Sequence, residues 1–403
     1  MHVVSQLGQG LWNAFQMAWE VAWALVLGFL LSGIVQAWVP RSRMQRALGG
    51  RDARALGLAT ALGAASSSCS YAAVAIAKSM FQKGASFAAA MAFQFASTNL
   101  VFELGIVTWI FLGWQFTLAE LVGGLVLIVL MWVLVRAFVS PRLEEQARSQ
   151  AVAADTGHQH VSAGREGIGL RRRLASLDSW ADVAHNFRGD WKMLWREIVA
   201  GFVIAGFVSL LPIKVFNALF VTDAPGPLRL LENVVVGPLV AVLSFVCSVG
   251  NIPLAAVLFA GGISFAGVIA FVFADLIIVP LVIVYRRYYG ALAWRLVAIM
   301  FASMVVAALL VDGIFSAAGL VPEKRPSVDS IASRGIAWNY TSVLNVIFLA
   351  VAAWLVALTV RRGARDPVCG MTVDRRAGGP TVVRGGRRYF FCSEDCKARF
   401  ASP

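Results

Sequence analysis

Two interruptions in otherwise apolar stretches carry side chains that could bind a solute. The first reads Ser-Ser-Ser-Cys-Ser-Tyr over residues 66–71, and the second reads Cys-Ser-Val-Gly-Asn-Ile-Pro over residues 247–253. Thiolates prefer soft, thiophilic ions, so two cysteines facing one cavity would suit a metal or metalloid. Small residues that merely allow close helix packing, or inert buried thiols, would leave the same pattern. The candidate ligands are Ser68, Cys69, Ser70, Tyr71, Cys247, Ser248 and Asn251.

The two interruptions occupy equivalent positions of an internal repeat. Cys69-Ser70 matches Cys247-Ser248 at an offset of 178 residues, which is 247 minus 69. The same offset pairs Gly84 with Gly262, Ser86 with Ser264, Phe87 with Phe265, Phe93 with Phe271 and Phe95 with Phe273. Each half of the chain is therefore one copy of a single design, and the two interruptions are expected to meet.

A few polar side chains inside predicted membrane spans are candidates for an ion or proton pathway. Asn99 and Glu103 lie one helical turn apart within the span 85–112, and Asp275 lies in the corresponding span of the second half. A carboxylate costs roughly 2.5–3.5 kcal/mol at the centre of a membrane helix, so such groups usually face the bundle interior and relay protons or bind ions. A structural hydrogen bond, or an ion pair with Lys78, is the plainer alternative.

Three cysteines gather in the last forty or so residues. Cys392 and Cys396 are spaced to share one face of a short helix, and Cys369 in Asp-Pro-Val-Cys-Gly-Met can approach them from a turn. In a cytoplasmic tail three thiols favour a metal over a disulfide, with zinc or copper as the candidates. A tetrahedral zinc site has four ligands, so the fourth would come from elsewhere. Transport itself is expected to need no cofactor.

The composition places most of these residues in a membrane. Hydrophobic residues make up 59% of the 403 positions and charged residues 14%, against about 45–50% and about 25% in ordinary soluble domains. Apolar stretches such as 22–39, 118–135 and 343–360 are long enough to cross a hydrocarbon core. We therefore expect the lipid bilayer as a partner, and neither a soluble enzyme nor a nucleic-acid-binding protein, although the net charge is +13.

Arginine clusters predict the topology, because Lys and Arg are enriched in cytoplasmic loops. Clusters lie within 41–54, 142–173 and 361–365, and they share one side only if the stretch 55–81 turns back at 66–71 instead of crossing. Each half then has three full crossings and one hairpin, so the second copy must be inverted. The N-terminus is predicted outside, and the central linker and the tail are predicted in the cytoplasm.

The predicted fold is an all-α polytopic membrane protein with two inverted repeats, each of three full helices plus a re-entrant or broken helical hairpin. One extra C-terminal transmembrane helix and a small α+β, treble-clef-like tail complete it. The polar stretch 150–186 reads as linker, disordered for much of its length. The predicted boundaries are repeat 1 at 1–140, linker at 141–192, repeat 2 at 193–312, extracytoplasmic loop at 313–338, last helix at 339–361 and tail at 366–403.

Two family resemblances follow from these motifs. The tail resembles a YHS domain, a small module associated with heavy metals, through Asp-Pro-Val-Cys-Gly-Met at 366–371 and Tyr-Phe-Phe-Cys-Ser-Glu-Asp-Cys at 389–396, although the His-Ser pair of the name is absent. The membrane part, 24–311, resembles the predicted permease family that includes the ArsP-type organoarsenical exporters, through Cys69-Ser70 and the motif 247–254. That resemblance implies efflux of trivalent organoarsenicals or heavy metals, with Cys69 and Cys247 as ligands.

These observations predict an inner-membrane efflux permease for a metal or metalloid cargo. Ion coupling is expected, since the sequence holds no Gly-rich, Lys-containing phosphate loop. A transporter of an unrelated small solute and a membrane-bound metal sensor are the alternatives. An enzyme is not expected, because no nucleophile, base and orienting group stand together. The oligomeric state and the identity of the cargo stay open.

Overall fold

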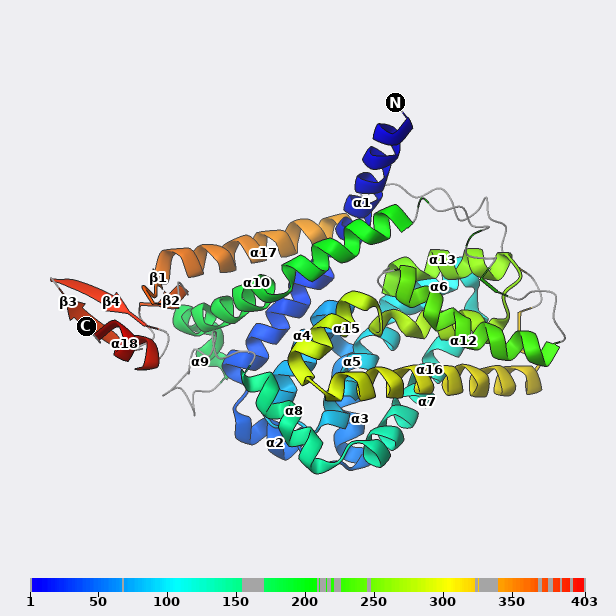
Figure 1. Cartoon of the computed structure of the whole chain (residues 1–403), viewed down its shortest axis with the longest axis horizontal. Helices are drawn as coiled ribbons and strands as arrows, with labels where there is room; N and C mark the ends of the chain where they lie inside the picture. Colours follow the sequence, from blue (N-terminus) through cyan, green and yellow to red (C-terminus); the bar gives the residue numbers. More distant parts are fainter. Residues whose placement is uncertain are drawn as a thin grey trace.

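The computed structural model describes a body of packed helices that ends in a small two-part sheet region (Figure 1). Five helices are long and apolar enough to cross a membrane, or up to seven if two bent helix pairs each count as one span. The coarse prediction, a mostly helical multi-pass protein with a small sheet in the tail, is confirmed. The described residues are 2–66, 69–153, 170–208, 210, 215, 219–220, 226–244, 248–322, 325, 340–368, 372–375, 380–384, 386–391 and 394–401.

Two helices of the first half have equivalents of nearly the same length in the second half. The first half contains α1 (His2–Trp38), α2 (Arg41–Leu48), α3 (Ala53–Ser66), α4 (Ser70–Gln82), α5 (Phe87–Asn99), α6 (Phe102–Leu112), α7 (Trp114–Phe138) and α8 (Pro141–Ala153). The second contains α9 (Leu170–Ala175), α10 (Leu177–Val208), α12 (Gly226–Ser244), α13 (Ser248–Ala260), α14 (Phe265–Phe273), the 3₁₀ turn η1 (Ala274–Leu276), α15 (Val279–Tyr289) and α16 (Leu292–Ala317). Shifted by 178 residues, α4 coincides with α13, and α7 with most of α16.

Local details repeat at the same offset. Ser86 caps α5 by accepting a hydrogen bond from the Ala89 amide, and Ser264 caps α14 in the same way. The turn before each cap contains a glycine with a positive φ angle, 100° at Gly84 and 110° at Gly262. Glycine adopts this conformation without the steric strain that a side chain would cause. The sequence repeat is therefore reproduced at the level of turns and caps.

In the first half, the chain leaves and returns between α2 and α5. The Ser86 amide donates to the Leu48 carbonyl at 2.7 Å, so the two ends of the intervening segment meet. Gly63 on α3 packs directly on the Phe93 carbonyl of α5. The helices α3 and α4 thus leave from and return to the same end. The turn expected at 66–71 stays a prediction, because residues 67 and 68 between these helices lie outside the described set.

The same reversal occurs in the second half. The Asn233 side chain on α12 accepts from the Ser264 amide at 2.8 Å, at the start of α14. One turn further along α12, Gly237 packs against the Gly267 carbonyl. The helices α12 and α14 therefore run in the same direction, and α13, which connects them, runs back between two reversals.

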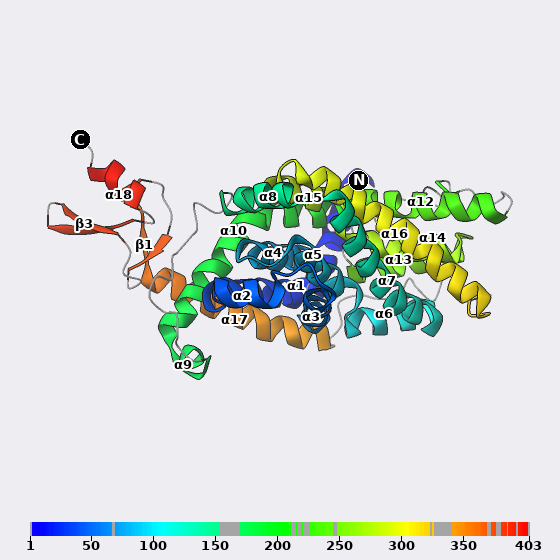
Figure 2. The same ribbon diagram turned by 90° about the horizontal axis from the view of Figure 1, so that it is seen from below.

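Repeat-related helices also pack on one another, and they run antiparallel. A Cβ at Gly33 of α1 would lie 2.8 Å from the Val183 carbonyl of α10, whereas near the other end of α1 Gly10 faces Gly206. Glycine is needed at these crossings because the backbones themselves are in contact. Helices α7 and α16 likewise pair lengthwise, as Figures 1 and 2 show.

Two features differ from the predicted spans. Each span expected at 85–112 and 264–285 is bent by 45°, at the α5–α6 break and at the η1–α15 break. The helix α10 begins at Leu177, inside the stretch predicted to be a largely disordered linker. Its polar first half is ordered because Trp180 packs between Trp38 of α1 and Trp354 of the last helix, at ring distances of 5.0 and 5.6 Å.

The last transmembrane-length helix, α17 (Tyr340–Arg362), packs on α1 and is hydrogen-bonded to it. Asn345 is fully buried, accepts from the Trp23 amide at 2.9 Å and donates to the Trp19 carbonyl at 2.6 Å. The tail then projects from one end of the helical body (Figures 1 and 2). It contains β1 (Gly363–Arg365) antiparallel to β2 (Thr372–Asp374), β3 (Thr381–Arg384) antiparallel to β4 (Arg387–Phe390), and α18 (Glu394–Ala401).

Candidate functional site

The two helical tips meet at one buried carboxylate. The Ser70 hydroxyl at the start of α4 donates to Asp275 Oδ2 at 2.8 Å, and the Ser248 hydroxyl at the start of α13 donates to the same oxygen. The two serine oxygens lie 3.1 Å apart. Asp275 is fully buried. Three residues from three sequence regions, all predicted site residues, thus form one polar centre.

The local sequence explains why these groups converge. Asp275 lies in η1, where the helix breaks before Pro280, so its side chain sits at an interruption of a span and not inside a continuous helix. Helix α4 begins at Ser70 and α13 at Ser248, and the first turns of both leave backbone amides without helical partners. The serines that begin two helices therefore both bind one carboxylate, which lies beside the positive ends of these helices.

Cys69 stands next to this centre. It occupies the N-cap position of α4 with extended backbone, and its side chain is half-buried against the core. Its repeat equivalent Cys247 lies outside the described residues, as does Ser68. The predicted convergence of the two thiols stays a prediction.

Tyr71 fills the space between α4 and α10. A Cβ added at Gly201 of α10 would lie under 3.0 Å from the Tyr71 hydroxyl, with Pro280 behind it. Tyr71 is 5% exposed. The tyrosine therefore fixes the first tip against the second half of the chain, and only a glycine leaves room for it.

Two buried amides carry unused polar atoms. Neither the oxygen nor the nitrogen of the Asn251 side chain has a hydrogen-bond partner within the described part of the chain, and the residue is fully buried. Asn251 follows Ser248 by three residues on α13, so both lie on one helix face, toward Asp275. The Asn99 oxygen is also without a described partner, while its nitrogen donates to the Phe95 carbonyl. Such atoms suit a site that admits water or cargo.

Lys78, the predicted ion-pair partner, is buried in the bundle. It is 2% exposed, with its nitrogen 4.5 Å from the ring centre of Tyr288 and 4.0 Å from the Met193 sulfur. The ion pair with Glu103 stays a prediction, because the Glu103 side chain lies outside the described set.

The tail site is described only in part. Cys396 lies half-buried on α18, but Cys369 and Cys392 fall outside the described residues. Within the described ranges, no group of three or more His, Cys, Asp or Glu side chains could hold a metal ion. Phe391 is the buried aromatic residue of the tail and packs against Phe400 at a ring distance of 5.1 Å.

Sequence reasoning missed a second buried carboxylate, Glu120 on α7. It is 1% exposed and accepts a hydrogen bond from the Thr108 hydroxyl of α6 at 2.7 Å. The signal was present, since Glu120 lies inside the apolar stretch 118–135 that predicts a span. A carboxylate in the middle of a span marks a functional candidate by itself.

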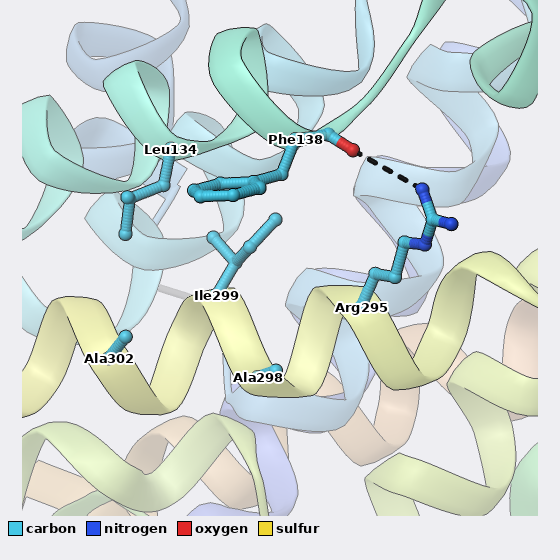
Figure 3. A pocket seen from close by; sticks show the side chains of 6 residues that line it. All are labelled: Leu134, Phe138, Arg295, Ala298, Ile299 and Ala302. Atoms are coloured by element: carbon cyan, nitrogen blue, oxygen red, sulfur yellow. Dashed lines mark hydrogen bonds between the residues drawn. The ribbon is translucent and has the colours of Figure 1, made fainter.

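A hollow on the bundle lies apart from these polar groups. It has a volume of about 320 Å³ and lies between α7 and α16, with an almost wholly apolar lining (Figure 3). Arg295 points across it to the Phe138 carbonyl. None of the predicted site residues lines it, and its apolar wall is typical of contact with lipid chains. Its lining residues are Leu134, Phe138, Arg295, Ala298, Ile299 and Ala302.

Comparisons with known proteins cover both parts of the chain. The model of a family described as a predicted permease, ArsP_1, matches residues 11–313, and that of the YHS domain matches residues 364–403. The "Putative permease Rv2963" of Mycobacterium tuberculosis is 46% identical over 349 residues, 85% of this chain and 84% of that protein. The "UPF0718 protein YraQ" of Escherichia coli K12 is 32% identical over 138 residues, 33% of this chain and 38% of that protein.

The tail has a relative of its own. A "Copper-transporting P-type ATPase" of Rhizobium leguminosarum is 60% identical over 38 residues, which is 9% of this chain and 4% of that protein. No solved structure matches the chain.

Proposed function

Because the chain belongs to the ArsP_1 family of predicted permeases, we propose that it is an inner-membrane permease that exports a thiophilic metal or metalloid, such as a trivalent organoarsenical. The observation that carries this proposal is the meeting of the two halves at Ser70, Ser248 and Asp275, since a cysteine immediately precedes each serine. Cargo would bind between Cys69 and Cys247, with Ser68, Tyr71 and Asn251 as flanking polar groups.

Export would proceed by movement of one repeat against the other. Antiparallel packing of α1 on α10 supports a second repeat that is inverted relative to the first. The return of the chain to its starting end in both halves supports re-entrant hairpins. Irregular backbone at membrane depth is tolerated only where protein or a cavity surrounds it. The arginine clusters support a cytoplasmic linker and tail and an external N-terminus.

Ion coupling would use the polar side chains of the bundle. Asp275 binds the first residue of both α4 and α13, so its charge state would respond to cargo binding. Asn99 and Glu103 lie at the break between α5 and α6 in the first half. Lys78 is buried in the bundle, where its positive charge would balance a carboxylate.

The tail is proposed to collect zinc or copper on the cytoplasmic side through Cys369, Cys392 and Cys396. Its likeness to a segment of a copper-transporting ATPase supports a role in metal handling. A chain ending at Arg362 should keep transport and lose tail-bound metal. A sensor that moves nothing would instead lose its whole phenotype with the tail.

Equilibrium dialysis of protein in nanodiscs tests the cargo site. The chain ending at Arg362 removes the three tail thiols, so the remaining cysteines are Cys69 and Cys247. Binding of methylarsenite, Cu(I) or Hg(II) at one equivalent per chain, lost in the Cys69→Ser, Cys247→Ser double variant, is expected. No binding of any of the three, or equal binding by the double variant, would overturn the thiol site.

A second candidate is a transporter of a small organic anion. The tips carry hydroxyls and the positive ends of α4 and α13 beside the Cys69 thiol, and such groups bind anions without any thiol. In that case the Cys69→Ser, Cys247→Ser variant keeps full transport and Ser70→Ala loses it.

A further inference from the structure

Glu120 is a carboxylate that the site at the two tips does not use. Its Oε2 atom accepts from the Thr108 hydroxyl at 2.7 Å, and its Oε1 atom has no hydrogen-bond partner in the described part of the structure. The residue lies on the buried face of α7. A polar group in this position needs either a proton or a cation to offset the cost of burial.

The face of α7 that carries Glu120 looks toward the polar centre. One turn further on, a Cβ at Gly124 would lie 3.6 Å from the Asn99 Cβ, and Gly123 contacts the Phe273 ring, two residues before Asp275. The Asn99 oxygen on this face is buried and unpartnered among described residues.

The two carboxylates have different surroundings. Asp275 receives hydrogen bonds from two serine hydroxyls at the positive ends of two helices, which stabilise a negative charge. Glu120 receives one hydroxyl, and no described Lys, Arg or His side chain forms an ion pair with it. A carboxylate that is buried without a cation is expected to keep its proton, because its charged form loses the stabilisation that water provides.

From this geometry we propose that Glu120 is the proton-binding residue of the permease: it is protonated at rest, while Asp275 carries the negative charge. Proton release breaks the carboxyl O–H bond, leaves a carboxylate and passes the proton to water; reprotonation from water on the other side reverses the step. Besides Asp275 on η1, the titratable Asp312 on α16 follows Val311, which contacts Gly123. The described residues of α5 carry no acidic or basic side chain.

The protonation of Glu120 does not depend on the proposed function, but its effect on transport does. Glu120→Gln mimics the protonated side chain at nearly unchanged size. The variant should therefore still exchange labelled for unlabelled cargo across the membrane, but it should lose net transport driven by a proton gradient. A residue that only holds α6 to α7 through Thr108 would affect exchange and net transport together.

Infrared spectroscopy of the full chain without cargo tests the proton directly. Wild type should show a deuterium-sensitive carbonyl band of a protonated carboxyl group, and Glu120→Gln should lose it. The matched control is Glu144→Gln, because Glu144 is also buried but forms salt bridges with Arg51 and Arg148. Thr108→Val should shift the band to higher frequency by removing the hydrogen bond, which serves as the readout if Glu120→Gln does not fold.

Identical bands in wild type and Glu120→Gln, with no shift in Thr108→Val, would overturn the proposal. Because no cargo is present, this result is independent of the cargo site. Failure of cargo binding at the cysteines leaves the band unaffected.

Discussion

Ser70 and Ser248, 178 positions apart, share one acceptor and lie 3.1 Å from each other. The donors are related by the repeat, but the acceptor is not, because the position of Asp275 is occupied by Ser97 in the first half. A single carboxylate therefore holds both tips. Movement of either tip must break a hydrogen bond to the same oxygen, which couples the two halves at one atom.

Removing either hydroxyl should weaken this junction. Ser70→Ala and Ser248→Ala each take one hydrogen bond from a buried charged group, a loss of about 1.5–3 kcal/mol. Because both bonds end on Asp275, the double variant should not show the sum of the single effects. The measurement is the free energy of unfolding in detergent together with transport rate.

Ser303→Ala provides the matched control, since Ser303 is fully buried and, among the described residues, its hydroxyl bonds the Ile299 carbonyl of its own helix. An effect of Ser303→Ala as large as that of Ser70→Ala would show that the junction has no special role. Strict additivity of the two serine variants would contradict a shared acceptor.

Gly201 and Tyr71 should behave as a coupled pair. Gly201→Ala places a Cβ under 3.0 Å from the Tyr71 hydroxyl, so we expect a loss of about 1–3 kcal/mol by overpacking. Tyr71→Phe removes the clashing oxygen and should restore much of the stability lost in Gly201→Ala. Thermal unfolding of the two single variants and the double variant checks this; no rescue in the double variant would place the clash elsewhere.

Two arginines should hold the bases of the hairpins independently. Arg148 donates to the Phe81 and Ala85 carbonyls, and Arg325 donates to the equivalent Phe259 and Ile263 carbonyls. Arg148→Gln should accelerate amide hydrogen exchange around 79–86, and Arg325→Gln around 257–264, because each loosens only its own turn. Faster exchange at both turns in either variant would contradict this separation.

Lys83 should make the stability depend on pH. Burial, together with the nearby charge of Arg173, lowers the pKa of Lys83 to about 8. The unfolded chain keeps the ordinary, higher pKa, so between the two values it binds more protons than the folded chain, and stability rises with pH from about 8 upward.

The check is the free energy of unfolding as a function of pH. Wild type should gain stability relative to Lys83→Met as the pH rises through this window. The variant also loses the bonds from Lys83 to the Gln36 and Val39 carbonyls, a constant offset that does not change with pH. Parallel curves for the two proteins would show that Lys83 has an ordinary pKa.

Hydropathy and composition were enough to predict a mostly helical, multi-pass chain with a small sheet in its tail. The offset that joins Cys69 to Cys247 also positions the caps at Ser86 and Ser264, because both follow from the same local sequence. The start of α10 could not be predicted from hydropathy, since its first half is polar and is ordered only by contacts of Trp180 with two other helices.

The sequence was enough to select the polar residues of the site, but not to predict which of them form hydrogen bonds with one another. Ser70, Ser248 and Asp275 could each be singled out, but the shared hydrogen bond depends on the bend at η1, which has no clear sequence signal beyond Pro280. Glu120 was overlooked because its neighbours are strongly apolar, so the stretch reads as a plain span.

Transport in everted membrane vesicles tests the central claim most directly. Accumulation of methylarsenite, copper and mercury is compared between wild type, Cys69→Ser, Cys247→Ser, their double variant and the control Ser303→Ala. The account predicts uptake of at least one cargo by wild type and by Ser303→Ala, and its loss in the double variant. No uptake of any of the three cargoes, or equal uptake by the double variant, would contradict export through a thiol site at the tips.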